Sequence, residues 1–592
     1  MRTLPALLLS TMLTAAATAQ TTIPNGYWPE ERSNEILAKT ETIRLAPDLS
    51  RLSAEERSAV NDLLSVGQIF QRIYEQSRHH QAVDAHRRLI DLDRQLGSPK
   101  RTRNLLDLYR LSQGPIATTL DNKREPFIPV DPQVPARNVY PIDTTKAELE
   151  AFLAANPALR DEILAERTVV RRATKANADR DLAVLAKYPA LDTLHPNLGA
   201  RLRAVAAKPE PKAFYAVPYP VEYSDELMEA HSLLRRAADK LQPSDEEFAR
   251  FLRNRARDLI TNDYESGDAS WITGRFKNLN AQIGAYETYD DALFGVKAFH
   301  AVSILLADEK ETAELRRKLT GLQAIEDALP YQNHKKIRED IPVGVYDVIA
   351  DFGQARGTNT ATILPNDALF SRRYGRTILL RRNIMTNPQI FAASERIWRA
   401  ATAEAHHADV ASVGDFQRTL WHEIGHYLGV DRDKQGRTLD VALEDYADAV
   451  EEMKADLVSL FALHRMQTDP ATLRAVQSSG IRRTLQNVQP RRDQPYQTMQ
   501  LVQFNWFLDK GLIAADPATG RLTIRYERYP ETVNSLLQEV LKLQHEGDKA
   551  ATAAFFDRWT TWKPELHDKL AARIREAQGA RFRIVRYAAL GE

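Results

Sequence analysis

Cysteine is absent from the whole chain of 592 residues. No disulfide can form and no thiolate can bind a metal, so any metal site must use histidine and carboxylate side chains. An excess of charge of either sign is also missing, since acidic and basic residues number 80 each. The sequence therefore provides no overall charge that would attract nucleic acid or an anionic membrane, and we expect neither as a partner.

Long hydrophobic runs are scarce, and the apolar stretch that stands out is at the N-terminus, in MRTLPALLLSTMLTAAATAQ. It combines Arg2, a short apolar run over residues 4–13 and the small residues of an Ala-Thr-Ala triplet at 17–19. This is the pattern of a secretory signal peptide, with Gln20 as the first mature residue. The run is too short to span a bilayer comfortably, although an uncleaved anchor is the alternative. No cysteine follows it, which excludes a lipoprotein anchor. We expect export, to the periplasm or the medium, without stable membrane insertion after cleavage.

Most of the remaining chain has the pattern of helices. Residues 220–242 and 244–260 each carry Ser-Asp followed by apolar residues at helical spacing. Residues 341–367 instead contain β-branched residues and glycines without a helical period, which is typical of strands and loops. The segments 376–385 and 521–529 have the same character. This pattern predicts a mainly helical α+β fold, and the length predicts at least two lobes.

A metal site is indicated by TLWHEIGHYLGV, residues 419–430. His422 and His426 are four residues apart, so both can point at one ion from the same face of a helix. Glu423 can reach a water on that ion and act as its base, which is what amide hydrolysis requires. A solvated helix with two surface histidines is the plainer alternative.

Carboxylates that could complete this site occur downstream, in YADAVEEMKADLVSLFAL. Glu452 and Asp456 are four residues apart and share a helix face, so one can bind zinc while the other accepts a ring N–H from a ligating histidine. The apolar LVSLFAL run that follows predicts a buried helix, in which unpaired acids would be costly. A solvated acidic helix face is the alternative.

Several motifs together resemble the dipeptidyl-peptidase III family, peptidase family M49. HEIGHYLG, followed 25 residues after His426 by EEMKAD, is similar to the zinc site of its bacterial and plant branch, which has a five-residue His-Glu-x-x-His motif. AYETYDDALFGVKAFHA at 285–301 and ILPNDALFSRRYGRTILLRRNI at 363–384 resemble two further family segments. The resemblance is clear from about residue 220 to residue 545.

The resemblance implies a role for each matching residue. It implies one Zn²⁺ per chain bound by His422, His426 and Glu452, with Glu423 activating the water and with Glu451 and Asp456 supporting the ligands. It further implies that Tyr289 donates a hydrogen bond to the developing oxyanion. Glu287 and Asn366 would hold the free amino terminus of a short peptide substrate, which is how the family counts off two residues.

Two positions depart from the family pattern. Ile363 stands where the family usually has an asparagine that helps to anchor the amino terminus, and Tyr496 stands where it has a histidine that supports catalysis. Dipeptide specificity and full rate are the properties that these changes affect. Some family members are fused to a nudix domain, but the chain has no Gly-rich nudix segment, so nudix phosphohydrolase activity has no support.

The family fold implies two lobes around a wide cleft, a helix-rich zinc-bearing lobe and a lobe with a small β-barrel core. We divide the chain into a signal peptide at 1–19, mostly the β-containing lobe with N-terminal helices at 20–307, crossover segments including strands of the β core at 308–392, the helical zinc-binding lobe at 393–580 and a C-terminal segment at 581–592.

The expected function is an exported zinc metallopeptidase that releases N-terminal dipeptides. Two alternatives stay open: a zinc-binding, peptide-binding protein with little turnover, and an aminopeptidase or oligopeptidase without the dipeptide rule.

Overall fold

The computed structural model describes residues 23–121, 123–337, 342–364, 373–375, 377–490 and 494–592. The predicted signal peptide and Asn366 lie outside these residues. The chain divides into two units, one formed by Met1–Leu37 with Gln81–Gln133 and the other by Ala38–His80 with Val134–Glu592. Among the described residues, no helix is both long enough and apolar enough to cross a membrane.

The smaller unit is a set of helices with one hairpin. Arg101 joins its parts, because its guanidinium donates to the backbone oxygens of Trp28 (2.9 Å) and Tyr27 (2.8 Å). Its elements are α1 Glu30–Leu37, α3 Ala82–Gln95, α4 Lys100–Ser112, β2 Ile116–Thr118 and β3 Arg124–Pro126.

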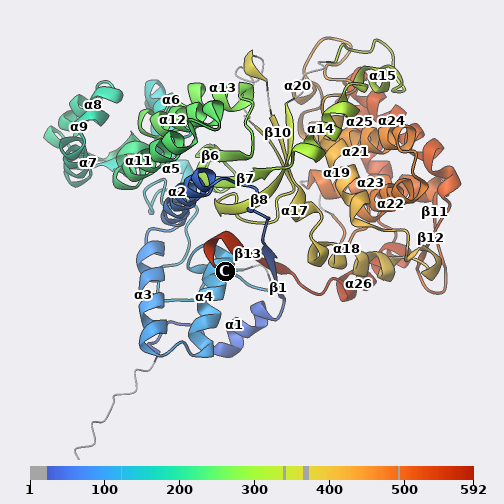
Figure 1. The fold of residues 1–592 in the computed structure, drawn as a ribbon, viewed down its shortest axis with the longest axis horizontal. Coiled ribbons are helices and arrows are strands. Elements are labelled where there is room, and N and C mark those ends of the chain that lie inside the picture. Colours follow the sequence, from blue (N-terminus) through green and yellow to red (C-terminus); the bar gives the residue numbers. More distant parts are fainter. Residues whose placement is uncertain (1–22, 122, 338–341, 365–372, 376, 491–493) are drawn as a thin grey trace, which may run out of the picture. The chain divides into compact units, whose positions relative to one another are not determined.

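A five-stranded sheet forms the centre of the first half of the larger unit, and Figure 1 shows its strands in green and yellow. Its order is β6-β7-β8-β10-β9, with β8 and β10 parallel and the other neighbours antiparallel. The strands are β6 Leu279–Glu287, β7 Phe299–Ala307, β8 Val343–Gly353, β9 Ala361–Leu364 and β10 Thr377–Arg381. No ladder joins β6 to β9 within the described residues, so closure into the small barrel stays a prediction.

Helices cover this sheet and form a core with it. The 25-residue α2 (Ala54–Arg78) packs on β7 and β8, and α11 packs on α2 and α12. Both helices expected from the Ser-Asp segments are present, and Asp245 caps α12 by accepting from Phe248 N. The other helices of this part are α5 Lys146–Ala155, α6 Arg160–Ile163, α7 Lys175–Lys187, α8 Pro189–Leu194, α9 Leu198–Ala207, α10 Tyr219–Glu222, α11 Ser224–Leu241, α12 Glu246–Thr261 and α13 Glu265–Thr273.

A second hydrophobic core is almost entirely helical. Its centre is α21, whose residues 457–463 are all buried, as the apolar LVSLFAL run predicted. Helices α19, α22, α23 and α24 pack around α21. The helices of this part are α14 Glu309–Leu319, α15 Leu322–Asp327, α17 Arg382–Met385, α18 Pro388–Ala401, α19 Ser412–Gly425, α20 Leu439–Leu443, α21 Ala447–Met466, α22 Pro470–Arg483, α23 Pro495–Asp509, α24 Tyr529–Glu546, α25 Lys549–Trp559 and α26 Pro564–Ala577.

Three short sheets complete the larger unit. The pairs are β1 Thr40–Leu45 with β13 Phe582–Tyr587, β4 Thr168–Ala173 with β5 Glu210–Pro218, and β11 Ile513–Ala515 with β12 Leu522–Ile524. The prediction of strands and loops at 521–529 is right as far as residue 525, because a 3₁₀ segment follows and α24 begins at Tyr529. The mainly helical α+β class is confirmed, whereas the residue boundaries of the lobes stay predictions.

Candidate metal centre and substrate pocket

The His-Glu-x-x-His motif lies at the C-terminal end of α19. His422 and Glu423 are in its last turn, and His426 is the residue that follows Gly425 as the C-cap. The backbone of His426 keeps helical geometry, with φ −66° and ψ −22°, so both rings still point to one side. Their centroids are 5.0 Å apart. Both histidines therefore point to one side, as their four-residue spacing predicted, although the helix itself ends between them.

Close packing of α19 on α21 brings the histidines to the acidic segment. Gly425 lies directly against α21, where an added Cβ would stand 2.6 Å from the backbone oxygen of Ala455. Any larger residue would push the helices apart, since Cβ atoms do not approach oxygens this closely. The glycine between the two histidines thus sets the distance between the motif and Glu452.

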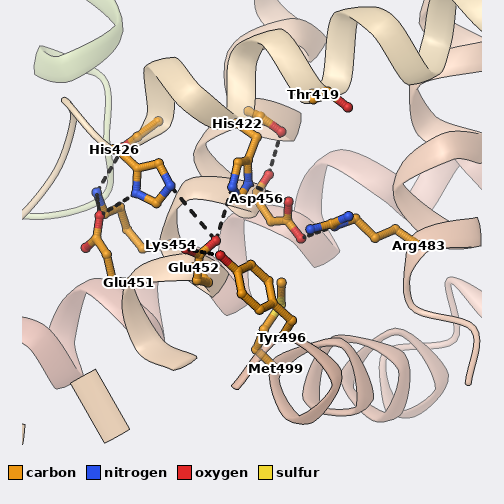
Figure 2. Close-up of polar contacts among 12 residues, drawn as sticks. Thr419, His422, His426, Glu451, Glu452, Lys454, Asp456, Arg483, Tyr496 and Met499 are labelled. Carbon is orange, nitrogen blue, oxygen red and sulfur yellow. Dashed lines mark hydrogen bonds and ion pairs between the residues drawn. The ribbon is translucent and has the colours of Figure 1, made fainter. Parts of the chain in front are cut away.

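Three donor atoms converge between these helices (Figure 2). Glu452 Oε2 lies 3.2 Å from His422 Nε2 and 3.9 Å from His426 Nε2. Ligand atoms of the three residues all lie within 4.8 Å of one another. Glu452 Oε2 is buried and accepts no hydrogen bond, which would be costly unless a cation takes that place. Two imidazoles and one carboxylate are a ligand set that suits zinc, so the residues present fit this metal.

The other nitrogen of each ring is held by a carboxylate. His422 Nδ1 is 2.8 Å from Asp456 Oδ1, and His426 Nδ1 is 2.9 Å from Glu451 Oε1. A ring that donates from Nδ1 keeps a lone pair on Nε2, so both contacts select the tautomer that can bind a metal. Burial opposes protonation of His422, but Asp456 and Glu452 raise its pKa to about 9. The site therefore favours positive charge.

Asp456 is fully charged and tightly held. Its carboxylate accepts from Arg418 Nη1 and from Arg483 Nε, each at 3.1 Å, in addition to His422. Burial alone would raise the pKa of Asp456, but Arg483 and His422 hold it well below the usual range. The acid therefore keeps the His422 ring in place as a permanent anion.

Glu451 is held by the buried Lys454. Lys454 Nζ lies 2.7 Å from Glu451 Oε1 and also donates to the backbone oxygens of Gly425 (2.9 Å) and Leu428 (2.8 Å). Carbonyls at a helix C-terminus lack partners within the helix, so this lysine completes the end of α19. Burial opposes the charge on Glu451, but Lys454 and His426 lower its pKa to about 2.

Tyr496 also reaches the site, from the first turn of α23. Its hydroxyl donates to Glu452 Oε1 at 2.9 Å, as Figure 2 shows, while the side chain is 46% exposed. Because Oε1 is occupied, Glu452 presents its other oxygen, Oε2, to the two histidines. Tyr496, which stands where the family has a histidine, therefore orients the proposed ligand Glu452.

The carboxylate of Glu423 is half-buried beside His422. Its negative charge contributes to the raised pKa of His422, so it acts on the ring of a proposed ligand. A carboxylate in this condition can accept a proton from a water molecule at the site.

The described residues that were expected to contact substrate, Glu287 and Tyr289, lie at the end of β6 in the five-stranded sheet rather than in α19 or α21. Glu287 ends β6, and Tyr289 follows two residues later with 68% of its side chain exposed. Partial burial and the carboxylates of Asp290 and Glu287 raise the pKa of Tyr289 to about 12, so its hydroxyl keeps the proton that it would donate. Ile363 lies in β9 opposite Ile378.

Sequence reasoning missed the cations that surround the ligands. Arg418, Lys454 and Arg483 hold Asp456 and Glu451, yet none was given a role. Lys454 could have been recognised from the sequence, because a lysine in a helix that is expected to be buried needs an acidic partner nearby. Arg483 comes from α22, and no local pattern links it to Asp456.

The fold is that of dipeptidyl-peptidase III structures, which confirms at the level of fold the resemblance stated above. The solved structure of DPP III from Caldithrix abyssi matches with a TM-score of 0.78 and 23% identity, covering 94% of this chain and 99% of that one. That of dipeptidyl-peptidase III from Corallococcus sp. strain EGB matches with a TM-score of 0.71 and 24% identity, covering 95% and 98%.

One curated protein is also similar in sequence. It is Nudix hydrolase 3 of Arabidopsis thaliana, 26% identical over 447 residues, which are 72% of this chain. The match covers 54% of that protein, so the chain spans about half the length of the relative. No protein-family model matches the chain.

Proposed function

We propose that the chain is a zinc metallopeptidase that releases dipeptides from the free amino terminus of short peptides. The observation that carries this proposal is the convergence of His422 Nε2, His426 Nε2 and the buried Glu452 Oε2, with both Nδ1 atoms held by carboxylates. The similarity to dipeptidyl-peptidase III structures supports the substrate class.

The proposed mechanism assigns one task to each side chain. When bound, zinc would supply Lewis-acid polarisation. Glu423 accepts the proton of the attacking water and returns it to the leaving amine. Tyr289 donates a hydrogen bond from its hydroxyl to the oxyanion that forms on the scissile carbonyl. Glu287 pairs with the amino terminus of the peptide, with Asn366 as its expected companion, so that the second peptide bond is the one cleaved.

A matched pair of octapeptides tests this proposal. One has a free amino terminus, and the other is identical but N-acetylated. We expect the mature, zinc-loaded protein to remove dipeptides in sequence from the free peptide only, with loss of activity in a chelator. Mass spectrometry identifies the products. Release of single residues or internal fragments would instead support an aminopeptidase or oligopeptidase, and intact peptide with bound zinc would support a peptide-binding protein.

We also propose that the protein is exported, on the basis of residues 1–20. N-terminal sequencing of the protein purified from its source tests this directly. We expect the mature chain to begin at Gln20, whereas a chain that begins at its first residue or is recovered with membranes would contradict cleavage.

A further inference from the structure

A cavity of about 300 Å³ opens on the five-stranded sheet beside Glu287. Its walls come from β6, β7, β9 and β10 and from the segment after β8. The polar side chains among its lining residues are Gln282, Tyr286, Glu287, Tyr289, Gln354, Asn359, Thr362 and Arg381. One acid and one base therefore face the same space, in a cavity large enough for an amino-acid residue.

The base, Arg381, is the last residue of β10 and is only 1% exposed. Nη2 donates to Ser303 Oγ at 2.8 Å, but Nε and Nη1 have no acceptor. The guanidinium also forms no ion pair with any carboxylate among the described residues. A buried guanidinium that bonds only one neutral hydroxyl has lost its hydration without full compensation. Such a group favours an anion in the cavity.

The buried acid on the adjacent strand does not satisfy Arg381 directly. Asp351 lies on β8, next to β10, and is fully buried. Burial raises the pKa of Asp351, although the nearby Arg381 and Ser303 act in the opposite direction, so the acid is a weakened counter-charge for the guanidinium. Arg381 Nε and Nη1 are themselves buried, so the guanidinium at the wall of the cavity lacks a full counter-charge, which a carboxylate in the cavity would supply.

We propose that this cavity selects peptides whose first residue is aspartate or glutamate. The amino terminus pairs with Glu287, and the side-chain carboxylate accepts hydrogen bonds from Arg381. This inference rests on the proposed function, because it takes Glu287 as the partner of the amino terminus. A first residue of this kind carries both charges that the cavity complements, whereas a lysine or arginine side chain would meet the guanidinium as a like charge.

Binding calorimetry tests the inference without depending on turnover. The zinc-loaded Glu423→Ala variant prevents hydrolysis, and the ligands are Glu-Ala-amide and its near-isosteric partner Gln-Ala-amide. Neither ligand has a C-terminal carboxylate, so the side-chain carboxylate is the difference. We expect the glutamate ligand to bind at least about tenfold more tightly, as charge-assisted hydrogen bonds are stronger than neutral ones.

Two further variants test whether Arg381 causes the preference for the glutamate ligand. Adding Arg381→Met to the Glu423→Ala protein should bring the affinity ratio of the two ligands close to one. Adding Arg382→Met instead should leave the ratio unchanged, because the neighbouring Arg382 pairs with Asp308 and Asp347 and does not line the cavity. Thermal unfolding checks that both proteins are folded.

The outcomes separate this inference from the proposed function. Equal affinity for the two ligands in the Glu423→Ala protein would overturn the inference, even if Arg381→Met failed to fold. A preference that survives Arg381→Met would overturn it as well. N-acetylated Glu-Ala-amide tests the amino-terminus role of Glu287 separately: unchanged affinity would contradict that role, while the ratio of the other two ligands would still report on Arg381.

Discussion

At the scale of the residue, the metal group depends on the side chains that hold its ligands. Asp456 is the centre of this support, because it holds His422 and neutralises Arg418 and Arg483 at the same time. Tyr496 and Lys454 act on the other two ligands, one directly on Glu452 and one through Glu451. The geometry of the three ligands is thus fixed by partners from α19, α21, α22 and α23.

Asp456→Asn should weaken both zinc binding and stability. It removes the carboxylate that pairs with the buried Arg418 and the partly buried Arg483, which costs about 3–5 kcal/mol, and it loosens His422, which costs about 10- to 100-fold in metal affinity. Chelator competition measures the affinity, and denaturant unfolding measures the stability. Glu395→Gln is the control, since its exposed pair with Arg399 contributes little. Wild-type zinc affinity in Asp456→Asn would contradict the support that we assign to this acid.

Tyr496→Phe should lower zinc affinity by about tenfold while leaving the protein folded. The lost hydroxyl frees Glu452 Oε1, so the carboxylate is no longer held with Oε2 toward the histidines. Chelator competition again gives the affinity. Tyr188→Phe is a matched control, because that hydroxyl bonds the Asp225 carboxylate on the surface. Equal zinc affinity in the wild type and Tyr496→Phe would show that Tyr496 does not position the ligand.

At the scale of the element, the packing of α19 on α21 sets the site. Gly425→Ala should destabilise the protein by about 1–3 kcal/mol, because the new methyl group overlaps the Ala455 carbonyl. It should also weaken zinc binding, since the helices must separate. Gly357→Ala is the control, with no atom near its Cβ position. Urea unfolding and zinc titration measure both effects, and a Gly425→Ala protein as stable as Gly357→Ala would contradict the close packing.

Helices were predicted well where residues close together in the sequence mark their start and their buried face. The Ser-Asp starts and apolar spacing predicted α11 and α12, and the four-residue spacing of His422 and His426 predicted their shared direction. The strands and loops expected at 521–529 extend only to residue 525, because Pro530 favours the first turn of α24. Arg483 could not be placed at the site, since only the packing of α22 on α21 brings it there, whereas Tyr496 was placed near the site by the family resemblance alone.

At the scale of the whole molecule, stability should fall in mild acid because of His300. Burial among Phe70, Tyr219 and Tyr223, with Arg167 nearby, lowers the pKa of this imidazole to about 3. The folded pKa lies below the unfolded value near 6.5, so the stabilisation is present above pH 6.5 and is lost as the pH falls. Between pH 7.5 and pH 5.5 the loss should be about 1.4 kcal/mol.

Thermal unfolding of the wild type and of His300→Phe at these two pH values checks this prediction. The phenylalanine cannot bind a proton, so the fall in Tm on acidification should be smaller in the variant. An equal fall in both proteins would show that His300 does not contribute to the pH dependence. The group lies on β7, away from the proposed metal ligands, so loss of zinc would not produce the same difference.

In the proposed mechanism, Glu423 acts as a base beside a bound zinc ion. The most direct measurement is the hydrolysis of an unblocked octapeptide by Glu423→Ala that carries one zinc per chain, compared with the zinc-loaded wild type. We predict sequential release of dipeptides by the wild type and none by the variant at equal zinc content. Equal turnover by both proteins, or a wild type that binds no zinc, would contradict the account.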